Sequence, residues 1–386
     1  MAKYFPRGKF VWAALTLSLG WLFMFSVFTL SQPVVLVLKS GSINDSFGLA
    51  GNRLSTATSF FNKGLSSDST KVDFSALAPD IQAVISSRPL NLPSRVSVGR
   101  VVTLTFVGDI MLDRGVAASV RNNFNGNYED LFTELGFLRD RDIVFGNLEG
   151  PLSDQGQDIH NLYSFRMKPP ALPALVKAGF NVLSLANNHA GDWGREALID
   201  TVDRLAGAGI LTPGAGKRRA EAVNPQIKKV GDIKIGFLAF SDVGPVNLAV
   251  GDDQAGILLA TDSNFTGIIR QATEAVDVLV VSFHFGEEYQ TSPSPRQIAL
   301  AEQAIDLGAK IIVGHHPHVI QPVVEYGGGL IAYSLGNFIF DQNFSAETME
   351  GLVLEVELLN NDIADWRTRL IVLDNYFRPA EANNDR

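Results

Sequence analysis

Apolar, β-branched runs alternate with amphipathic stretches from residue 100 onward, a pattern typical of strands and helices in an α/β domain. Segment 277–284 is almost continuously apolar, as expected for a strand that is covered on both faces. Segments 192–208 and 295–307 have the periodicity of amphipathic helices. The strands predicted in this part of the chain are 100–109, 142–149, 181–186, 277–284 and 310–313.

The C-terminal part is richer in strands than in helices. Segment 228–241 predicts a hairpin with a Gly-Asp turn, and the further strands predicted are 319–325, 329–335, 352–358 and 366–373. A β/α half followed by a strand-rich half favours two packed sheets with helices outside them. We assign this domain to residues 100–376 and a polar tail to residues 377–386.

The N-terminus predicts a membrane anchor. No charged residue occurs from Phe10 to Leu38, and segment 10–30 is long enough, as a helix, to span the hydrocarbon core of a membrane. A cleaved signal peptide and a buried core helix are the alternatives, but the apolar run is longer than the apolar region of a usual signal peptide.

The flanking residues predict how this anchor is oriented. Lys3, Arg7 and Lys9 precede it, so residues 1–9 are expected in the cytoplasm and the rest of the chain outside the plasma membrane, as a single-pass protein. Residues 39–98 are expected to form a flexible extracytoplasmic tether, because much of this segment is rich in Ser, Gly, Asn and Thr.

Composition narrows the class of protein. The 386 residues include no cysteine, 46% are apolar, and the formal net charge is −9. The apolar fraction excludes a disordered chain, and the lack of cysteine excludes disulfides, thiolate metal sites and cysteine nucleophiles.

The charge is unevenly distributed along the chain. Residues 1–100 carry 10 Lys/Arg and 4 Asp/Glu, a net +6, which leaves −15 on the remainder. An acidic body without a basic patch argues against nucleic-acid binding.

Side chains that can bind metal ions stand at or near the ends of five predicted strands. They are Asp109, Asn147 and Glu149, Asn188 and His189, His284, and the group His315, His316 and His318. Ligand sites of open α/β sheets lie outside the carboxyl ends of strands. The mixed carboxylate, amide and imidazole set suits Mn, Fe, Zn or Ni. Taken singly, each residue also has an ordinary reading as a helix cap, turn residue or core histidine.

The sequence GHHPH strengthens the metal interpretation. It holds three imidazoles within four positions, and they have no obvious role in packing. His316 and His318 are two positions apart and share a face if the backbone is extended, which leaves His315 to point away or to cap the strand. Five of the six histidines fall in the strand-end motifs, and His160 lies elsewhere.

The order of these motifs resembles the calcineurin-like metallophosphoesterase superfamily. More closely, GDIMLDRGV, FGNLEGPL, NVLSLANNHAGDWG, SFHFGEEY and GHHPHVIQPVVEYGGGLIAYSLGNFIFDQ are similar to the CapA family, named for capsule and poly-γ-glutamate synthesis. The resemblance covers about residues 101–375. It implies a four-layer α-β-β-α sandwich of two mixed sheets flanked by helices, with one N-terminal transmembrane helix and an extracytoplasmic domain.

The resemblance also implies a divalent metal centre. It assigns metal binding to Asp109, Glu149, Asn188, His284, His316 and His318. It implies that His189 acts on the scissile group as an acid or charge stabiliser, and that Asp109 takes part in catalysis.

Two departures from the superfamily pattern concern a second ion. Met111 stands where the Asp-x-His motif has its histidine, and Glu149 stands in place of an aspartate. We therefore expect one tightly held ion or two of unequal affinity. His315 is an extra residue beside the Gly-His-x-His pattern.

Arg166, Glu288 and Asn337 are the candidate substrate-binding residues, with Arg166 suited to an anionic group. Asp341, in the same motif as Asn337, is a candidate to line the cleft or to support the ligands. Each of these residues equally suits a purely structural role.

Three functions stay open. The chain is a membrane-tethered metallohydrolase acting on an envelope phosphoester or γ-glutamyl amide, or a non-catalytic polymer-binding or export component of capsule assembly, or an envelope metallophosphoesterase or amidase unrelated to capsule. The resemblance implies other poly-γ-glutamate synthase subunits as partners and an anionic polymer or another envelope molecule as substrate. A domain of net charge −15 repels a polyanion at long range, so bound metal or a local basic groove would have to offset that repulsion.

Overall fold

The computed structural model describes residues 12–17, 21–26 and 100–382, which belong to two units that divide after Val101. In the larger unit the strands are β3 (Val101–Ile110), β4 (Ile143–Leu148), β5 (Val182–Ser184), β6 (Ala215–Gly216), β7 (Gln226–Val230), β8 (Ile233–Ser241), β9 (Gly256–Ile257), β10 (Val278–His284), β11 (Ile311–His315), β12 (Val323–Tyr326), β13 (Gly329–Ala332), β14 (Asn337–Ile339), β15 (Glu350–Leu359), β16 (Asp362–Leu373) and β17 (Pro379–Glu381). The α-helices are α3 (Arg114–Asn123), α4 (Leu172–Ala178), α5 (Gly194–Gly207), α6 (Arg219–Ala222), α7 (Phe265–Ala275) and α8 (Pro295–Asp306). Short 3₁₀ helices occupy Tyr128–Phe132, Gly136–Leu138, Pro169–Ala171, Val246–Leu248 and Glu347–Met349.

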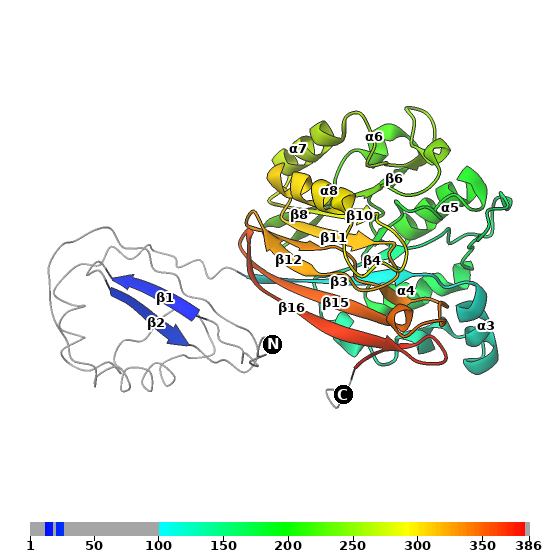
Figure 1. Cartoon of the computed structure of the whole chain (residues 1–386), viewed down its shortest axis with the longest axis horizontal. Helices are drawn as coiled ribbons and strands as arrows, with labels where there is room; N and C mark the ends of the chain where they lie inside the picture. The colour runs from blue at the N-terminus through cyan, green and yellow to red at the C-terminus, as the bar shows by residue number, and fades with distance from the viewer. Residues whose placement is uncertain (1–11, 18–20, 27–99, 383–386) are drawn as a thin grey trace. The chain divides into compact units, whose positions relative to one another are not determined.

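Two mixed sheets form the body of the larger unit (Figure 1). One has the order β17-β16-β15-β3-β4-β5, with β14 beside β3, and the other has the order β12-β13-β11-β10-β8-β7. Strands β3, β4 and β5 run parallel, as do β8, β10, β11 and β13. The pairs β7–β8, β12–β13, β15–β16 and β16–β17 are antiparallel.

The two sheets face each other across an apolar core. Phe106 and Phe145 from the first sheet pack in it with Phe237 and Val280 from the second. Successive side chains of a strand point to opposite faces, so β10 also sends Leu279 into a second core. The expectation that segment 277–284 is covered on both faces is therefore confirmed.

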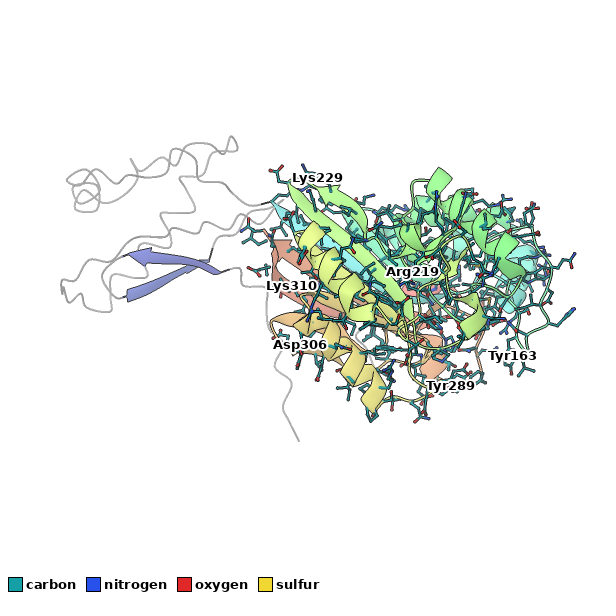
Figure 2. The ribbon with its side chains drawn as sticks, turned by 90° about the horizontal axis from the view of Figure 1, so that it is seen from above. Tyr163, Arg219, Lys229, Tyr289, Asp306 and Lys310 are labelled. Atoms are coloured by element: carbon teal, nitrogen blue, oxygen red, sulfur yellow. The ribbon has the colours of Figure 1, made fainter. Side chains whose placement is uncertain are left out.

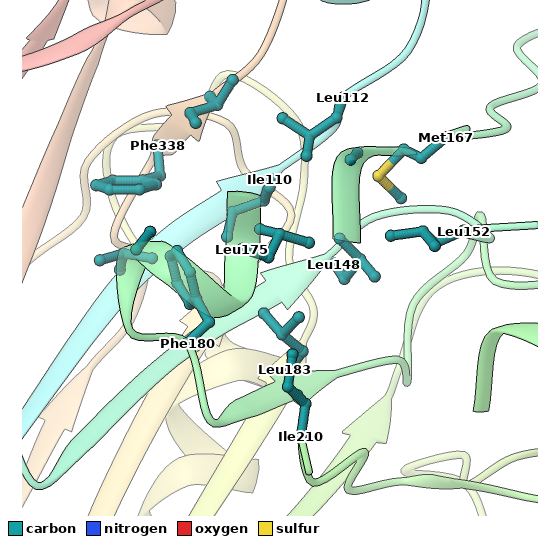
Figure 3. Close-up of a cluster of buried hydrophobic side chains, with 14 of the residues drawn as sticks. Ile110, Leu112, Leu148, Leu152, Met167, Leu175, Phe180, Leu183, Ile210 and Phe338 are labelled. Atoms are coloured by element: carbon teal, nitrogen blue, oxygen red, sulfur yellow. The ribbon is translucent and has the colours of Figure 1, made fainter. Parts of the chain in front are cut away.

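Helices cover the outer face of each sheet. The core under α3, α4 and α5 contains Val116, Leu175 and Leu198, and Figure 3 shows part of it around Leu175 and Phe180. The core under α7 and α8 contains residues of both helices, such as Ile268 and Leu300. The described part of the chain thus has the order helices, sheet, sheet, helices.

The hairpin predicted at 228–241 is present as β7 and β8, and Val230 pairs with Ile233 around the Gly-Asp turn. Gly231 adopts φ +60°, a conformation that a β-carbon disfavours. Helices α3, α6 and α7 were not predicted, and the expected polar tail contains β17, which pairs with β16. Tertiary pairing at the sheet edge overrides the weak strand propensity of that segment.

The helix expected over residues 10–30 is not what the structure describes. Trp12–Leu17 (β1) and Trp21–Ser26 (β2) form antiparallel strands. Aromatic residues favour strands as well as apolar helices, which gives this segment two competing propensities. Among the described residues, no helix is both long and apolar enough to cross a membrane. Residues 1–9 and the expected tether 39–98 lie outside the described residues.

Candidate metal centre

Parallel strands bring the predicted polar residues to one edge of the two sheets. The register of β3 and β4 places Asp109 opposite Asn147, and that of β10 and β11 places His284 opposite His315. The sheets meet at this edge: His315 Nδ1 lies 3.3 Å from Asp109 Oδ1, and His284 Nε2 lies 2.8 Å from Asn188 Oδ1. Residues far apart in the chain therefore share one site at the carboxyl ends of the strands.

Two fully buried carboxylates form the centre of this site. Asp109 and Glu149 are both 0% exposed. The amide of Asn147 lies between them, with Nδ2 donating to Asp109 Oδ1 at 2.8 Å and to Glu149 Oε2 at 3.3 Å. His318 also spans the pair, since its Nδ1 lies 3.4 Å from Asp109 Oδ2 and its Nε2 lies 3.7 Å from Glu149 Oε1.

The two buried carboxyl groups have opposite pKa shifts. Burial disfavours the charged form of Asp109, but His315 and His318 outweigh it and hold the pKa of Asp109 well below its ordinary value. Burial raises the pKa of Glu149 well above its ordinary value in spite of His318, and the charge of Asp109 adds to the rise. Burial opposes protonation of His318, yet Glu149 and Asp109 raise its pKa to about 9. Burial thus makes the charged form of Glu149 unfavourable, and a cation bound beside it would reverse that effect.

Several buried polar atoms of the site have no hydrogen-bond partner. They are Glu149 Oε1, His316 Nδ1 and both ring nitrogens of His315, of which Nδ1 has only the ion-pair contact with Asp109. Buried polar atoms in native proteins are nearly always paired, so unpaired ones at a single site indicate a missing ligand. Carboxylate oxygens and imidazole nitrogens are common ligands of divalent transition metals. The residues present therefore fit a divalent metal ion.

Two sets of three side chains are placed to hold such an ion. One consists of Asp109, Glu149 and His284, and the other of Glu288, His316 and His318. Within each set the ligand atoms lie within 4.8 Å of one another. Asn188 adjoins the first set through its contact with His284.

His189 lies beside the carboxylates with a fixed orientation. Its Nδ1 lies 2.7 Å from Asp192 Oδ2, and its Nε2 lies 3.9 Å from Glu149 Oε1. Asp192 is fully buried and also accepts hydrogen bonds from the backbone N–H of Phe165 and the side chain of Asn161, both at 2.8 Å. An acidic partner on one ring nitrogen directs the other toward the reacting group.

The position of the missing histidine is part of an apolar wall. Met111 is fully buried and packs in a cluster with Phe165 and Phe340. The Phe165 ring centroid is 4.0 Å from that of His189, and the Phe340 ring centroid is 4.8 Å from that of His318. Met111 therefore replaces a possible ligand with a surface that excludes water from one side of the site.

The expected extended backbone at the histidine cluster is wrong. His316 and His318 have φ angles of 98° and 58°, in the left-handed region that residues with a β-carbon rarely adopt. His315, expected to point away or cap the strand, is buried against Asp109 and stacks on Phe145 at 6.1 Å. All three imidazoles thus belong to the site, because the chain turns sharply after β11.

The predicted substrate-binding residues have different environments. Arg166 is not among the clustered groups: its guanidinium lies 3.4 Å from the centre of the Trp193 ring. Asn337 is fully buried and its Oδ1 contacts His318 Nδ1 at 3.0 Å, so its contacts position that histidine.

The two acidic candidates differ in their contacts. Asp341 accepts a hydrogen bond from Gly115 N at 2.8 Å at the start of α3 and pairs with Arg114. Glu288 is exposed and belongs to the second set of possible metal ligands.

Sequence reasoning missed three contributors, and each had a signal. The local sequence shows Asn147 only as a strand-end amide, but its register with Asp109 makes it the bridge between the carboxylates. The periodicity predicts Asp192 as the start of a helix, although its spacing three residues after His189 permits the observed contact. An extended strand end predicts that one imidazole, that of His315, points away, whereas the sharp turn after β11 keeps it in the site.

The chain was compared with known proteins. The sequence model of the family described as "Bacterial capsule synthesis protein PGA_cap" matches residues 103–342. "Capsule biosynthesis protein CapA" of Bacillus anthracis is 36% identical over 275 residues, covering 68% of this chain and 65% of that protein. "PGA biosynthesis protein CapA" of Bacillus subtilis is 34% identical over 269 residues, covering 68% of this chain and 69% of that protein.

The solved structures that are similar include two phosphatases or phosphoesterases. The calcineurin-like phosphoesterase YfkN from Bacillus subtilis is 14% identical, with a TM-score of 0.41 over 70% of this chain and 90% of that one. A phosphatase from Mycoplasma pneumoniae is 13% identical, with a TM-score of 0.44 over 71% and 94%. The family match includes the parallel strands of both sheets and all of the clustered carboxylates and imidazoles. This chain belongs to the bacterial capsule synthesis protein family PGA_cap.

Proposed function

We propose that this protein is a metal-dependent hydrolase of the cell envelope that acts in the synthesis or processing of a capsule polymer such as poly-γ-glutamate. One observation carries the proposal: two fully buried carboxylates lie among imidazoles, and several of these groups have no hydrogen-bond partner. The names of the relatives from Bacillus anthracis and Bacillus subtilis support the capsule role. The bond cleaved is a phosphoester or a γ-glutamyl amide.

The chain's own residues suit hydrolysis. Asp109, Glu149, Asn188, His284, His316 and His318 would hold one or two divalent ions. A bound ion would acidify water and polarise a phosphoryl or carbonyl oxygen.

His189 and the apolar wall complete the site. Asp192 directs His189 Nε2 toward the centre, where it is placed to donate a proton to a leaving group or to stabilise negative charge. The Met111 cluster keeps one side dry, which strengthens these electrostatic interactions.

The test is metal content and hydrolysis of the purified full-length chain. The substrates are a phosphodiester, a phosphomonoester and a γ-glutamyl peptide. We expect stoichiometric metal and turnover in the wild type, and loss of turnover with less bound metal in the double variant His316→Ala/His318→Ala. His160→Ala is the matched control, because His160 is exposed and lies outside the cluster.

Each result has a defined meaning. Turnover of one substrate class identifies the bond. Metal without turnover on any of them contradicts the hydrolase and favours a binding or export role in capsule assembly. A wild type that binds no metal contradicts the site itself.

We also propose that segment 10–30 anchors the protein in the plasma membrane with the metal centre outside. The uncharged run and the preceding lysines and arginine support this placement. Membrane fractionation tests it: the full chain is expected in the membrane pellet after alkaline extraction, and a variant lacking residues 1–38 in the soluble fraction. A soluble full chain with a shortened N-terminus would indicate a cleaved signal peptide instead.

A further inference from the structure

We propose that Glu288 is a metal ligand, and that with His316 and His318 it forms an outer site that binds a second divalent ion more weakly than the inner set. The inference rests on the proposed metal centre and adds to it a ligand outside the set that the family resemblance assigned. The two ligand sets differ most in exposure. Asp109, Glu149 and His284 are at most 1% exposed, whereas Glu288 is exposed above two buried histidines.

The backbone holds Glu288 beside the histidines. It lies in the loop after β10, and the next residue, Tyr289, donates its backbone N–H to Pro317 O at 2.8 Å. Pro317 stands between His316 and His318, so this hydrogen bond joins the two loops at the proposed site. Tyr289 has φ 65°, a third left-handed residue in the same small region. Strained backbone of this kind persists where surrounding structure enforces it, and it clusters at ligand sites.

His316 is the member of the outer set that most needs a partner. Its imidazole is 5% exposed, and its Nδ1 accepts or donates no hydrogen bond. The neighbouring rings of His284 and His318 have centroids 4.8 Å and 5.9 Å away, so its surroundings are rich in possible ligands. A cation held with Glu288 would satisfy this nitrogen.

Glu288 also adds a metal ligand to a centre in which one ligand position of the superfamily pattern is lost. Met111 contributes no ligand, being buried with Phe165 and Phe340. Glu288 is exposed and offers a carboxylate from the solvent side. The next residue, Tyr289, lies at the same end of the unit as Tyr163 (Figure 2). One exposed carboxylate and two imidazoles leave coordination positions for water or substrate. An ion at this mouth exchanges with solvent more readily than one enclosed by the inner set.

The test titrates metal-free, full-length protein with Mn²⁺. Free Mn²⁺ is followed by its electron paramagnetic resonance signal, and retained metal is measured by elemental analysis after desalting. We expect two equivalents at saturation in the wild type, of which about one is retained. In Glu288→Gln the dissociation constant of the weaker equivalent should rise at least about tenfold, while the retained equivalent is unchanged.

Glu287→Gln is the control, because Glu287 is the adjacent exposed carboxylate and belongs to neither set. Equal melting temperatures of the metal-free variants establish that the fold is intact. A Glu288→Gln titration identical to those of the wild type and Glu287→Gln overturns the inference, as does a wild type that binds a single equivalent. Both of those results leave the proposed function standing, whereas a wild type without metal contradicts the proposed function.

Discussion

At the scale of single residues, the site depends on partners that hold charged groups in place. Asp192 is fully buried and accepts from His189, Phe165 and Asn161, so one carboxylate fixes both a histidine and the loop beside it. Asn147 similarly separates two carboxylates that would otherwise repel each other. Neither residue needs to touch substrate to matter, because ligand and acid groups work only in the orientation that such partners impose.

Asp192→Asn tests this positioning role. Asparagine keeps the shape of the side chain, but one of its two terminal atoms is an NH₂ group, which cannot accept a hydrogen bond. Since Asp192 accepts from His189, Phe165 and Asn161, the variant should lose at least one of these hydrogen bonds and His189 should lose its fixed orientation. We expect turnover to fall about 10- to 100-fold with metal content unchanged. Steady-state kinetics and elemental analysis measure the two quantities. Asp203→Asn on the exposed face of α5 is the control. A rate equal to that of the control would show that Asp192 does not position His189.

Glu149→Gln tests the buried carboxylate by thermal unfolding. A ligand that binds only the folded state stabilises it by about 2.7 kcal/mol at a hundredfold excess over its dissociation constant. We expect Mn²⁺ to raise the melting temperature of the wild type and of Glu196→Gln, a surface control, but to raise that of Glu149→Gln much less. Without metal, Glu149→Gln should melt no lower than the wild type, because it removes a buried ionisable group. An equal Mn²⁺ effect in all three proteins would exclude Glu149 as a ligand.

At the scale of elements, a close backbone contact between β3 and the segment before β14 holds the strand end that carries Asp109. Asp109 N donates to Gly336 O at 3.0 Å, joining β3 to the segment before β14. A β-carbon on Gly108 would lie 1.9 Å from that oxygen, so the contact requires glycine. The same contact holds Asn337 in register with Asp109, which places it against His318.

Gly108→Ala should therefore destabilise the protein by about 1–3 kcal/mol, the usual cost of overpacking a core. It should also weaken metal binding, because β3 carries Asp109. Gly207→Ala is the matched control: no atom lies within 4 Å of its added β-carbon, and alanine in a helix should be neutral or stabilise by up to about 1 kcal/mol. Urea unfolding measures both variants. Similar midpoints for the two would mean that β3 and β14 can separate at little cost.

At the scale of the whole larger unit, one buried acid joins parts of the first sheet that are distant in sequence. Glu355 on β15 is 3% exposed and pairs with Arg141, which precedes β4, and with Arg367 and Arg369 on β16. Burial disfavours its charged form, but the three arginines outweigh it and lower the pKa of Glu355 below 4.5. The strand-rich C-terminal part is thereby linked to the parallel strands that carry the site.

This depressed pKa gives a pH dependence of stability. The stabilisation is present above the unfolded-state pKa of 4.5 and is lost as the pH falls through the lower folded-state value. Glu355→Gln should cost about 1–3 kcal/mol at pH 7, and the difference from wild type should shrink as the pH falls below 4.5. Urea unfolding across this range measures it.

Glu381→Gln is the comparison, because Glu381 pairs with the same Arg369 but is half exposed. Its effect should stay below about 1 kcal/mol at every pH. A Glu355→Gln difference that is constant with pH would show that the charge of Glu355 does not stabilise the fold.

Local pattern was enough to predict most strands and the chemical class of the site. The runs that became β3, β4, β10 and β11 are rich in β-branched and other apolar residues, so their strand structure could be predicted from local sequence. The identity of Asp109, Glu149, His284, His316 and His318 as clustered groups also followed from strand ends, because parallel strands share an edge. Helix α3 was missed because it is short and only two of its ten residues, Val116 and Val120, are large and apolar.

By itself, then, the sequence determined an α/β body and a set of polar residues at strand ends, because side-chain alternation and strand direction are local properties. Tertiary structure alone decided which of these groups touch. It turned the chain after β11 so that three imidazoles face the carboxylates, placed Arg166 on Trp193 instead, and brought Glu288 to the histidines. Contacts between loops depend on how the two sheets pack and on strained backbone angles. Neither of these can be predicted from the residues next to a given position in the sequence.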